Sequence, residues 1–144
     1  MGTETMGKVE VSAQLQNEFD LMRVRLGELT PQEVRVAEVE NALVDTGATL
    51  LSLPSRVIRQ LGLEPIRTKN VRTTNGVVTR TIYGGVRLTI DNRDFLCEAA
   101  ELPDDCPTLI GQIPLEGLDL VVDLSGRRLI GNPAHGGEAM YEEY

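Results

Sequence analysis

Aromatic residues are scarce in this chain, at 3% of 144 residues, and tryptophan is absent. A hydrophobic core must therefore be built almost entirely from Val, Leu, Ile and Ala side chains. Apolar residues still make up 41% of the chain and charged residues 25%, a balance typical of a globular protein rather than a disordered one. The length suits one domain with a single core.

Long apolar runs and a basic surplus are also missing. No stretch approaches the roughly 18 apolar residues that a membrane-spanning helix needs, and the polar residues 1–14 lack the apolar centre of a signal peptide. The sequence therefore predicts a cytoplasmic location and no membrane partner. The net charge of −8 would repel phosphate backbones, so nucleic acid is not expected as a partner.

Residues that bind metals or form disulfides are few. Cys97 and Cys106 lie nine residues apart, a spacing that permits a disulfide, but two reduced thiols are expected in a cytoplasmic chain. The single histidine, His135, lies in a Gly-rich tail and is expected to be solvated. Two cysteines and one distant histidine do not complete a zinc site, so the sequence predicts no metal and no other cofactor.

Alternation of apolar and polar residues at a period of two dominates the chain and predicts short β-strands. In the first, Val9, Val11, Ala13 and Leu15 share one face. The predicted strands are 8–16, 19–26, 32–40, 42–45, 84–90, 95–102, 108–112, 118–124 and 127–133. Many short strands with little helix indicate a small, closed, barrel-like all-β domain.

One or two short helices are predicted beside the strands. In the first, residues 54–62, Ser52 is expected to cap the start, Pro54 fits the first turn, and Gly62 can end the helix. Residues 113–118 predict one further helical turn. The domain is expected to span 8–133, between a flexible N-terminus (1–7) and a flexible C-terminal tail (134–144).

Asn75-Gly76 is the strongest hairpin signal in the sequence, because both residue types accept a positive φ. The flanking residues, 71–82, are rich in Thr and Val but also in basic side chains. They are too polar for a core. This hairpin is therefore expected to project into solvent.

Asp45-Thr46-Gly47 is the candidate catalytic segment, because apolar runs on both sides carry an acid toward the interior. Asp-Thr-Gly is also an ordinary turn sequence. A phosphoryl-accepting aspartate is a second alternative, but the lysine of an Asp-Lys-Thr-Gly sequence is missing. The third alternative is half of an aspartic protease site.

Residues 42–48, ALVDTGA, resemble the active-site signature of retroviral-type (retropepsin-like) aspartic proteases. That family follows its Asp-Thr-Gly with a flap hairpin, then with an apolar-apolar-Gly strand and a helical turn. Here the hairpin at Asn75-Gly76 comes second, Leu109-Ile110-Gly111 comes third, and 113–118 follows. The resemblance covers residues 8–133. The second apolar-apolar-Gly, at 129–131, is set aside because no helical turn follows it.

The resemblance implies an endopeptidase with no cofactor that acts on an extended peptide or protein. Its mechanism needs two carboxylates around a water, and one Asp-Thr-Gly per chain implies a homodimer in which the two copies of Asp45 meet. Thr46 would bond the opposite subunit, while Gly47 would offer its N–H to the carboxylate or the substrate. The implied site residues also include Ala48 in the active-site loop, Thr74, Asn75, Gly76, Val77 and Val78 in the flap, and Leu109, Ile110 and Gly111 in the supporting loop.

Two departures from viral members point to the cellular or bacterial branch of the family. Thr49 and Gln112 stand where viral enzymes carry an acid and an arginine, which suggests a hydrogen bond in place of an ion pair. Residues 127–133 are the expected interface segment. Pocket walls are expected at Leu43, Thr49, Leu50, Val78 and Ile113, which could equally be core residues. The alternative function is a non-catalytic dimerisation or peptide-binding module with the same fold.

Overall fold

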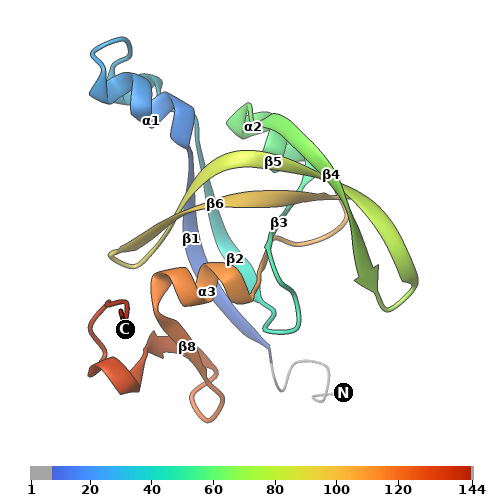
Figure 1. Cartoon of the computed structure of the whole chain (residues 1–144), viewed down its shortest axis with the longest axis vertical. Helices are drawn as coiled ribbons and strands as arrows, with labels where there is room; N and C mark the ends of the chain where they lie inside the picture. The colour runs from blue at the N-terminus through green and yellow to red at the C-terminus, as the bar shows by residue number, and fades with distance from the viewer. Residues whose placement is uncertain (1–7, 144) are drawn as a thin grey trace.

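Six strands close into a barrel in the computed structural model, which describes residues 8–143 (Figure 1). In their order around the barrel they are β1 (Val9–Asn17), β2 (Val36–Val44), β7 (Leu109–Ile110), β3 (Leu51–Pro54), β6 (Arg93–Leu102) and β5 (Gly76–Ile90). The ring closes where β5 pairs antiparallel with β1, from Gln14 opposite Thr89 to Asn17 opposite Val86. The predicted small closed barrel is therefore confirmed.

Three further strands lie outside the ring. The strand β4 (Glu64–Thr73) pairs antiparallel with the first part of β5, and the two project from the barrel as a long hairpin (Figure 1). The strands β8 (Leu120–Asp123) and β9 (Arg128–Gly131) form a separate antiparallel pair. Residues 127–133, the expected interface segment, thus include a strand that already pairs within its own chain.

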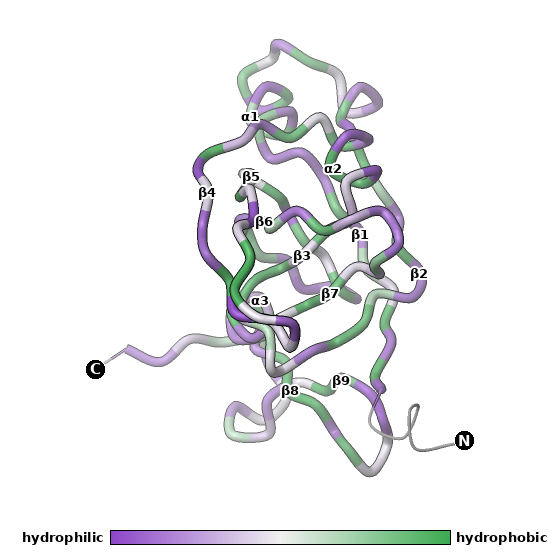
Figure 2. Tube along the Cα trace, turned by 90° about the vertical axis from the view of Figure 1, so that its right-hand side faces the viewer, coloured by the Kyte–Doolittle hydropathy of each residue, from purple (hydrophilic) through white to green (hydrophobic). Residues whose placement is uncertain are grey.

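The core is aliphatic, as the composition requires. Leu15, Leu51, Leu53, Leu88 and Ile110 are fully buried inside the barrel. Figure 2 shows hydrophobic and hydrophilic residues alternating along the strands, which places one set inside the barrel and the other in solvent. Burying such a side chain contributes about 1.5–3 kcal/mol, so each of these five positions stabilises the ring.

Two short helices occur where the sequence predicts them. The helix α2 (Ser55–Leu61) buries Val57, Ile58 and Leu61, and Gly62 ends it in the left-handed conformation with φ of 62°. The predicted cap at Ser52 is wrong, because Ser52 lies within β3 and Pro54 occupies the N-cap position without a side-chain hydrogen bond. The helix α3 (Gln112–Leu118) extends the predicted helical turn.

A third helix, α1 (Glu18–Arg25), replaces the strand predicted at 19–26. The side chain of Asn17 caps it by accepting the backbone N–H of Asp20 at 2.9 Å. Acidic residues then fill the first turn and basic residues the last, in accord with the helix dipole. Of the apolar residues that suggested one buried strand face, Met22 and Leu26 are exposed instead, at 45% and 66%, and Val24 is half-buried.

The chain between α1 and the barrel is fixed by one ion pair. Asp20 is buried and accepts two side-chain hydrogen bonds from Arg35, at 2.9 and 3.0 Å, and the Arg35 backbone N–H at 3.0 Å. These bonds lower the pKa of Asp20. A short 3-10 helix (Pro31–Glu33) precedes this point, and the separately predicted strands 32–40 and 42–45 form the single strand β2.

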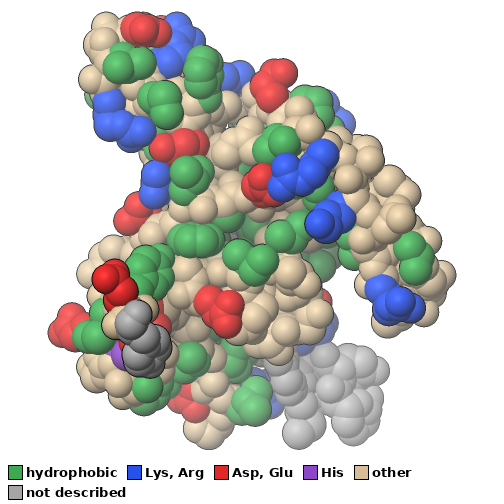
Figure 3. Space-filling view, in the orientation of Figure 1, with side chains coloured by type: hydrophobic (Ala, Val, Ile, Leu, Met, Phe, Trp, Pro, Cys, Tyr) green, Lys and Arg blue, Asp and Glu red, His purple; other side chains and the backbone are tan. Residues whose placement is uncertain are grey.

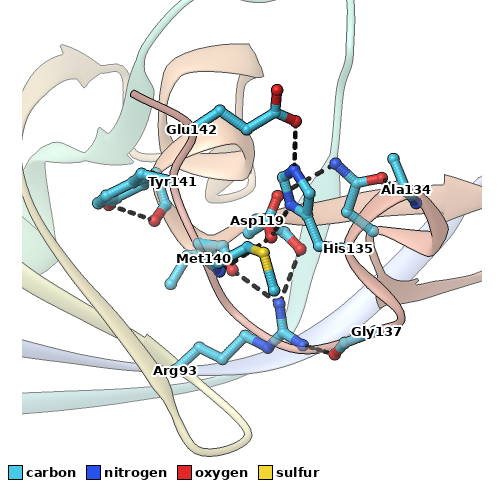
Figure 4. Close-up of polar contacts among 11 residues, drawn as sticks. Arg93, Asp119, Ala134, His135, Gly137, Met140, Tyr141 and Glu142 are labelled. Carbon is cyan, nitrogen blue, oxygen red and sulfur yellow. Dashed lines mark hydrogen bonds and ion pairs between the residues drawn. The ribbon is translucent and has the colours of Figure 1, made fainter. Parts of the chain in front are cut away.

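The C-terminal residues fold back onto the end of α3 (Figure 4). His135 lies in a 3-10 helix (Pro133–His135), and its ring contacts Asp119 Oδ2 and Glu142 Oε2, each at 2.6 Å. Arg93 donates to the carbonyl oxygens of Leu118 and Asp119, at 3.1 and 2.7 Å. The expectation of a solvated His135 is wrong, because its side chain is only 10% exposed.

The remaining predictions concern cysteines, membranes and the N-terminus. Cys97 and Cys106 are both free thiols, and burial raises the pKa of Cys97 to about 12. Within residues 8–143, no helix has the length and apolar character to cross a membrane. The flexible N-terminus predicted for residues 1–7 lies outside the described residues.

Candidate active site

Asp45 lies where β2 ends, at the start of a loop that returns to the barrel as β3. The two-residue strand β7 lies between them: Ile110 pairs with Val44 of β2 in parallel and with Leu51 of β3 antiparallel. Loop 45–50 therefore passes over the end of β7. Its position is set by three strands that meet at one buried residue, Ile110.

Backbone and side-chain hydrogen bonds orient Asp45 within this loop. Its N–H donates to the Ile110 carbonyl at 2.9 Å, and its own carbonyl accepts the Ala48 N–H at 3.0 Å. The carboxylate oxygen Oδ1 accepts the Gly47 N–H at 3.0 Å. Asp45 is half-buried, while Thr46 and Gly47 are exposed. The carboxylate is thus held by its own loop and faces a surface open to solvent.

A second loop braces the first through its backbone. The N–H of Gln112 donates to the Ala48 carbonyl, and the N–H of Ile113 donates to the Thr49 carbonyl, both at 2.9 Å. The expected side-chain hydrogen bond between Thr49 and Gln112 does not occur within the described chain. The resemblance to the protease family therefore predicted the correct pair of segments, but the contact between them is made by backbone atoms and not by the Thr49 and Gln112 side chains.

Gly111 makes this close approach geometrically feasible. A Cβ atom at Gly111 would lie 2.5 Å from the Leu50 carbonyl oxygen and 2.8 Å from the Ala48 carbonyl oxygen. Both contacts are with backbone, which cannot move aside as a flexible side chain can. The three predicted supporting residues, 109–111, are thus brought against the Asp45 loop.

The projecting hairpin turns within the predicted tip. Thr73 pairs directly with Gly76, so Thr74 and Asn75 form the loop, and of these residues only Gly76 has a positive φ, of 108°. Of the two residue types whose tolerance of a positive φ predicted the turn, only the glycine, Gly76, adopts it. The Thr73 hydroxyl, which sequence reasoning missed, accepts the Asn75 N–H at 3.2 Å and donates to the Gly76 carbonyl at 2.8 Å.

The hairpin tip stands apart from Asp45 in the single chain. The hairpin and loop 45–50 extend from the barrel in the same direction in Figure 1. No hydrogen bond joins the two among residues 8–143, and Val77 beside the tip is 59% exposed. The predicted residues 74–77 are thus exposed in the chain, Val78 is half-buried, and all five lie near its projecting end.

A polar network that sequence reasoning missed anchors the base of this hairpin. The Tyr83 hydroxyl donates to Glu101 Oε1 at 3.0 Å, and the Ser55 hydroxyl donates to Glu101 Oε2 at 2.7 Å. Burial, and then the bond to Glu101, raises the pKa of Tyr83. The network joins β5, β6 and the start of α2. The sequence feature that could have indicated this network is Glu101, an acid within the apolar run 95–102.

The residues predicted to line a substrate pocket are not core residues. Leu43, Leu50 and Val78 are half-buried, whereas Thr49 and Ile113 are exposed. Two pockets on residues 8–143 lie elsewhere, one beside Ala37–Asn41 and the other beside Arg25 and Arg87; Asp45 lines neither. A single chain thus presents the Asp45 loop on an open surface.

A closed barrel in which an apolar-apolar-Gly strand braces an Asp-Thr-Gly loop has the architecture of a retropepsin-like aspartic protease domain. A family model described as "gag-polyprotein putative aspartyl protease" matches residues 33–116. The match includes Asp45, the hairpin and Gly111, and it covers more than half of the chain. The chain belongs to this family of aspartic proteases. No curated protein matches the chain.

Proposed function

We propose that this chain is an aspartic endopeptidase that works as a homodimer. The observation that carries the proposal is the exposed Asp45 loop, braced by Gly111 and belonging to a chain with a single Asp-Thr-Gly. Hydrolysis by this class of enzyme needs two carboxylates. A second copy of the same surface supplies the missing one under a two-fold axis.

In the proposed mechanism the two copies of Asp45 hold one water molecule between them. The ionised carboxylate takes a proton from the water, which attacks the carbonyl carbon of the scissile bond. The protonated carboxyl gives its proton to the carbonyl oxygen as negative charge develops there, so that a tetrahedral diol forms. The carboxyl that gained the water's proton then passes it to the nitrogen of the scissile bond, the C–N bond breaks, and the other carboxylate takes a proton from a diol hydroxyl to leave a carboxylic acid and an amine. The Gly47 N–H, already bonded to Oδ1 at 3.0 Å, keeps the ionised group in position through the reaction.

The hairpin β4–β5 acts as the flap in this proposal. An extended peptide would lie between the hairpin and loop 45–50, with its backbone bonded as an added strand. The Tyr83–Glu101–Ser55 network gives the hairpin a fixed base, and the exposed tip at 74–77 is free to close over the substrate. Residues 127–133 are the proposed interface segment.

The test compares the wild-type protein with Asp45→Asn and with a control, Asp91→Asn. Asp91 is exposed in the turn between β5 and β6 and has a positive φ of 55°, which asparagine also accepts. We expect wild type and Asp91→Asn to cleave a peptide library and Asp45→Asn to cleave none. Sedimentation should show a dimer for all three proteins.

Specific results would overturn the proposal. Cleavage by Asp45→Asn at the wild-type rate would remove Asp45 from the mechanism. Activity per chain that does not change with protein concentration, in a protein that sediments as a monomer, would exclude the shared site. A wild-type dimer that binds peptides but cleaves none between pH 3 and 8 would instead support the non-catalytic peptide-binding module.

A further inference from the structure

The charge of the projecting hairpin is opposite to that of the rest of the chain. Between Glu64 and Asp91 there is no acidic residue, whereas five of the fourteen Lys and Arg residues fall in this stretch. The rest of the chain contains the other nine basic residues and all 22 acidic residues. Figure 3 shows Lys and Arg side chains along the hairpin and at its projecting end. The hairpin is thus a local cationic element on an acidic protein.

Three of these cations have no carboxylate partner within residues 8–143. Arg67 pairs with Glu98, and Arg87 pairs with Glu18 and Asp94 at the far end of β5. Lys69, Arg72 and Arg80, which we call the basic hairpin patch, form no ion pair in the described chain. Lys69 and Arg72 are exposed and Arg80 is half-buried, so all three can meet a ligand.

Two members of the basic hairpin patch lie directly opposite each other. Lys69 of β4 and Arg80 of β5 are cross-strand partners in the antiparallel register. Like charges in such a pair destabilise a hairpin, by up to about 1 kcal/mol. Arg72, opposite Val77, projects from the other face of the strand. A bound carboxylate between Lys69 and Arg80 would offset the repulsion that the hairpin otherwise bears.

We propose that Lys69 and Arg80 of the basic hairpin patch select peptide substrates that carry Asp or Glu. The inference rests on the proposed function, because the hairpin meets the substrate only if it closes as a flap. Carboxylates in the substrate would pair with Lys69 and Arg80 as the hairpin closes. The remaining acidic surface would repel the same peptide elsewhere and favour this one site.

An acidic peptide fits the patch better than a nucleic acid does. Proteins that bind single strands combine cations with aromatic side chains on which the bases stack, and residues 65–82 contain no aromatic residue. Tyr83, which follows, is held at the hairpin base by Glu101. Three cations are also few for a polyanion that the rest of this acidic chain would repel.

Binding to the inactive Asp45→Asn protein tests the proposal independently of catalysis. The probes are two fluorescent peptide libraries that differ only in carrying Glu or Gln at fixed positions. We expect tighter binding of the Glu library, a preference that fades at high salt. In the double variant Lys69→Gln/Arg80→Gln, the ratio of the affinities for the Glu and Gln libraries should fall about three- to tenfold. This is the effect expected from losing two ion pairs at the protein surface.

Arg23→Gln is the matched control, since Arg23 lies on α1 and forms a single exposed ion pair with Glu28 at 3.6 Å. It should leave the preference unchanged. Equal binding of the two libraries, or an equal loss in Arg23→Gln and the double variant, would overturn the proposal. Salt-sensitive binding of a single-stranded oligonucleotide in place of the peptides, lost in the double variant, would assign the patch to nucleic acid.

Discussion

Replacing Gly111 with alanine tests the contact that braces the Asp45 loop. Gly111 has a φ of −92°, which alanine adopts freely, so the cost comes from sterics alone. The added Cβ would lie 2.5 and 2.8 Å from two backbone carbonyl oxygens. Overpacking of this kind costs about 1–3 kcal/mol. Weakening the Gln112 and Ile113 hydrogen bonds to loop 45–50 adds about 0.5–1.5 kcal/mol each.

We therefore expect Gly111→Ala to lose about 2–6 kcal/mol of unfolding free energy, a large share of the 5–15 kcal/mol typical of a domain. The assay is urea unfolding at a fixed protein concentration, because the proposed dimer makes stability depend on concentration. The control is Gly27→Ala, where an added Cβ would have no atom within 4 Å. There the alanine is disfavoured only by the positive φ of 77°, which costs about 1 kcal/mol of unfolding free energy. A smaller loss for Gly111→Ala than for Gly27→Ala would refute the steric argument.

Three further substitutions test the rest of the fold. Asp20→Ala should lose about 1–3 kcal/mol of unfolding free energy, because Arg35 loses three hydrogen bonds. The pKa of Asp20 is lowered in the folded protein, so the contribution of Asp20 to stability should decrease as the pH falls below 3.8. In an NMR titration, His135 should show a pKa above its ordinary 6.5, because hydrogen bonds to Asp119 and then to Glu142 raise it. The stability that the protonated His135 gains from Asp119 is then fully present below pH 6.5 and is lost as the pH rises through the raised pKa of the folded protein. Asp119→Asn should bring the pKa of His135 back toward 6.5. Leu15→Ala should lose about 2–5 kcal/mol in urea unfolding, because the side chain is fully buried.

Local sequence signals predicted the parts of the fold whose physics is local. The alternation that buries Val9, Ala13 and Leu15 requires only a period of two, and Gly62 ends α2 because its left-handed φ suits glycine. The hairpin turn was found for the same reason. The two-residue loop is Thr74-Asn75, and Gly76, which has the positive φ, pairs with Thr73. Such signals locate a turn more reliably than they fix which residues pair across it.

Elements that depend on distant partners were missed. The segment 19–26 alternates as a strand would, yet Asn17 caps it as a helix, and Asp20 is bonded to Arg35, fifteen residues away. The Glu101 bonds to Ser55 and Tyr83 are likewise invisible locally, because these residues are far apart in sequence. A charged residue within an apolar run indicates that a partner exists. Only the fold identifies which residue it is.

The two apolar-apolar-Gly segments illustrate why the order of motifs was more informative than any motif alone. At both Gly111 and Gly131 an added Cβ would press against backbone, so the tripeptide itself marks only a close approach. Gly111 approaches the Asp45 loop, and α3 begins directly after it. Gly131 ends β9 and approaches Gly137 of the C-terminal segment instead. The expectation that no helical turn follows Gly131 is wrong, because a 3-10 turn (Pro133–His135) begins two residues later. Gly111 differs in that α3 begins at the next residue and directs the N–H groups of Gln112 and Ile113 at the Asp45 loop.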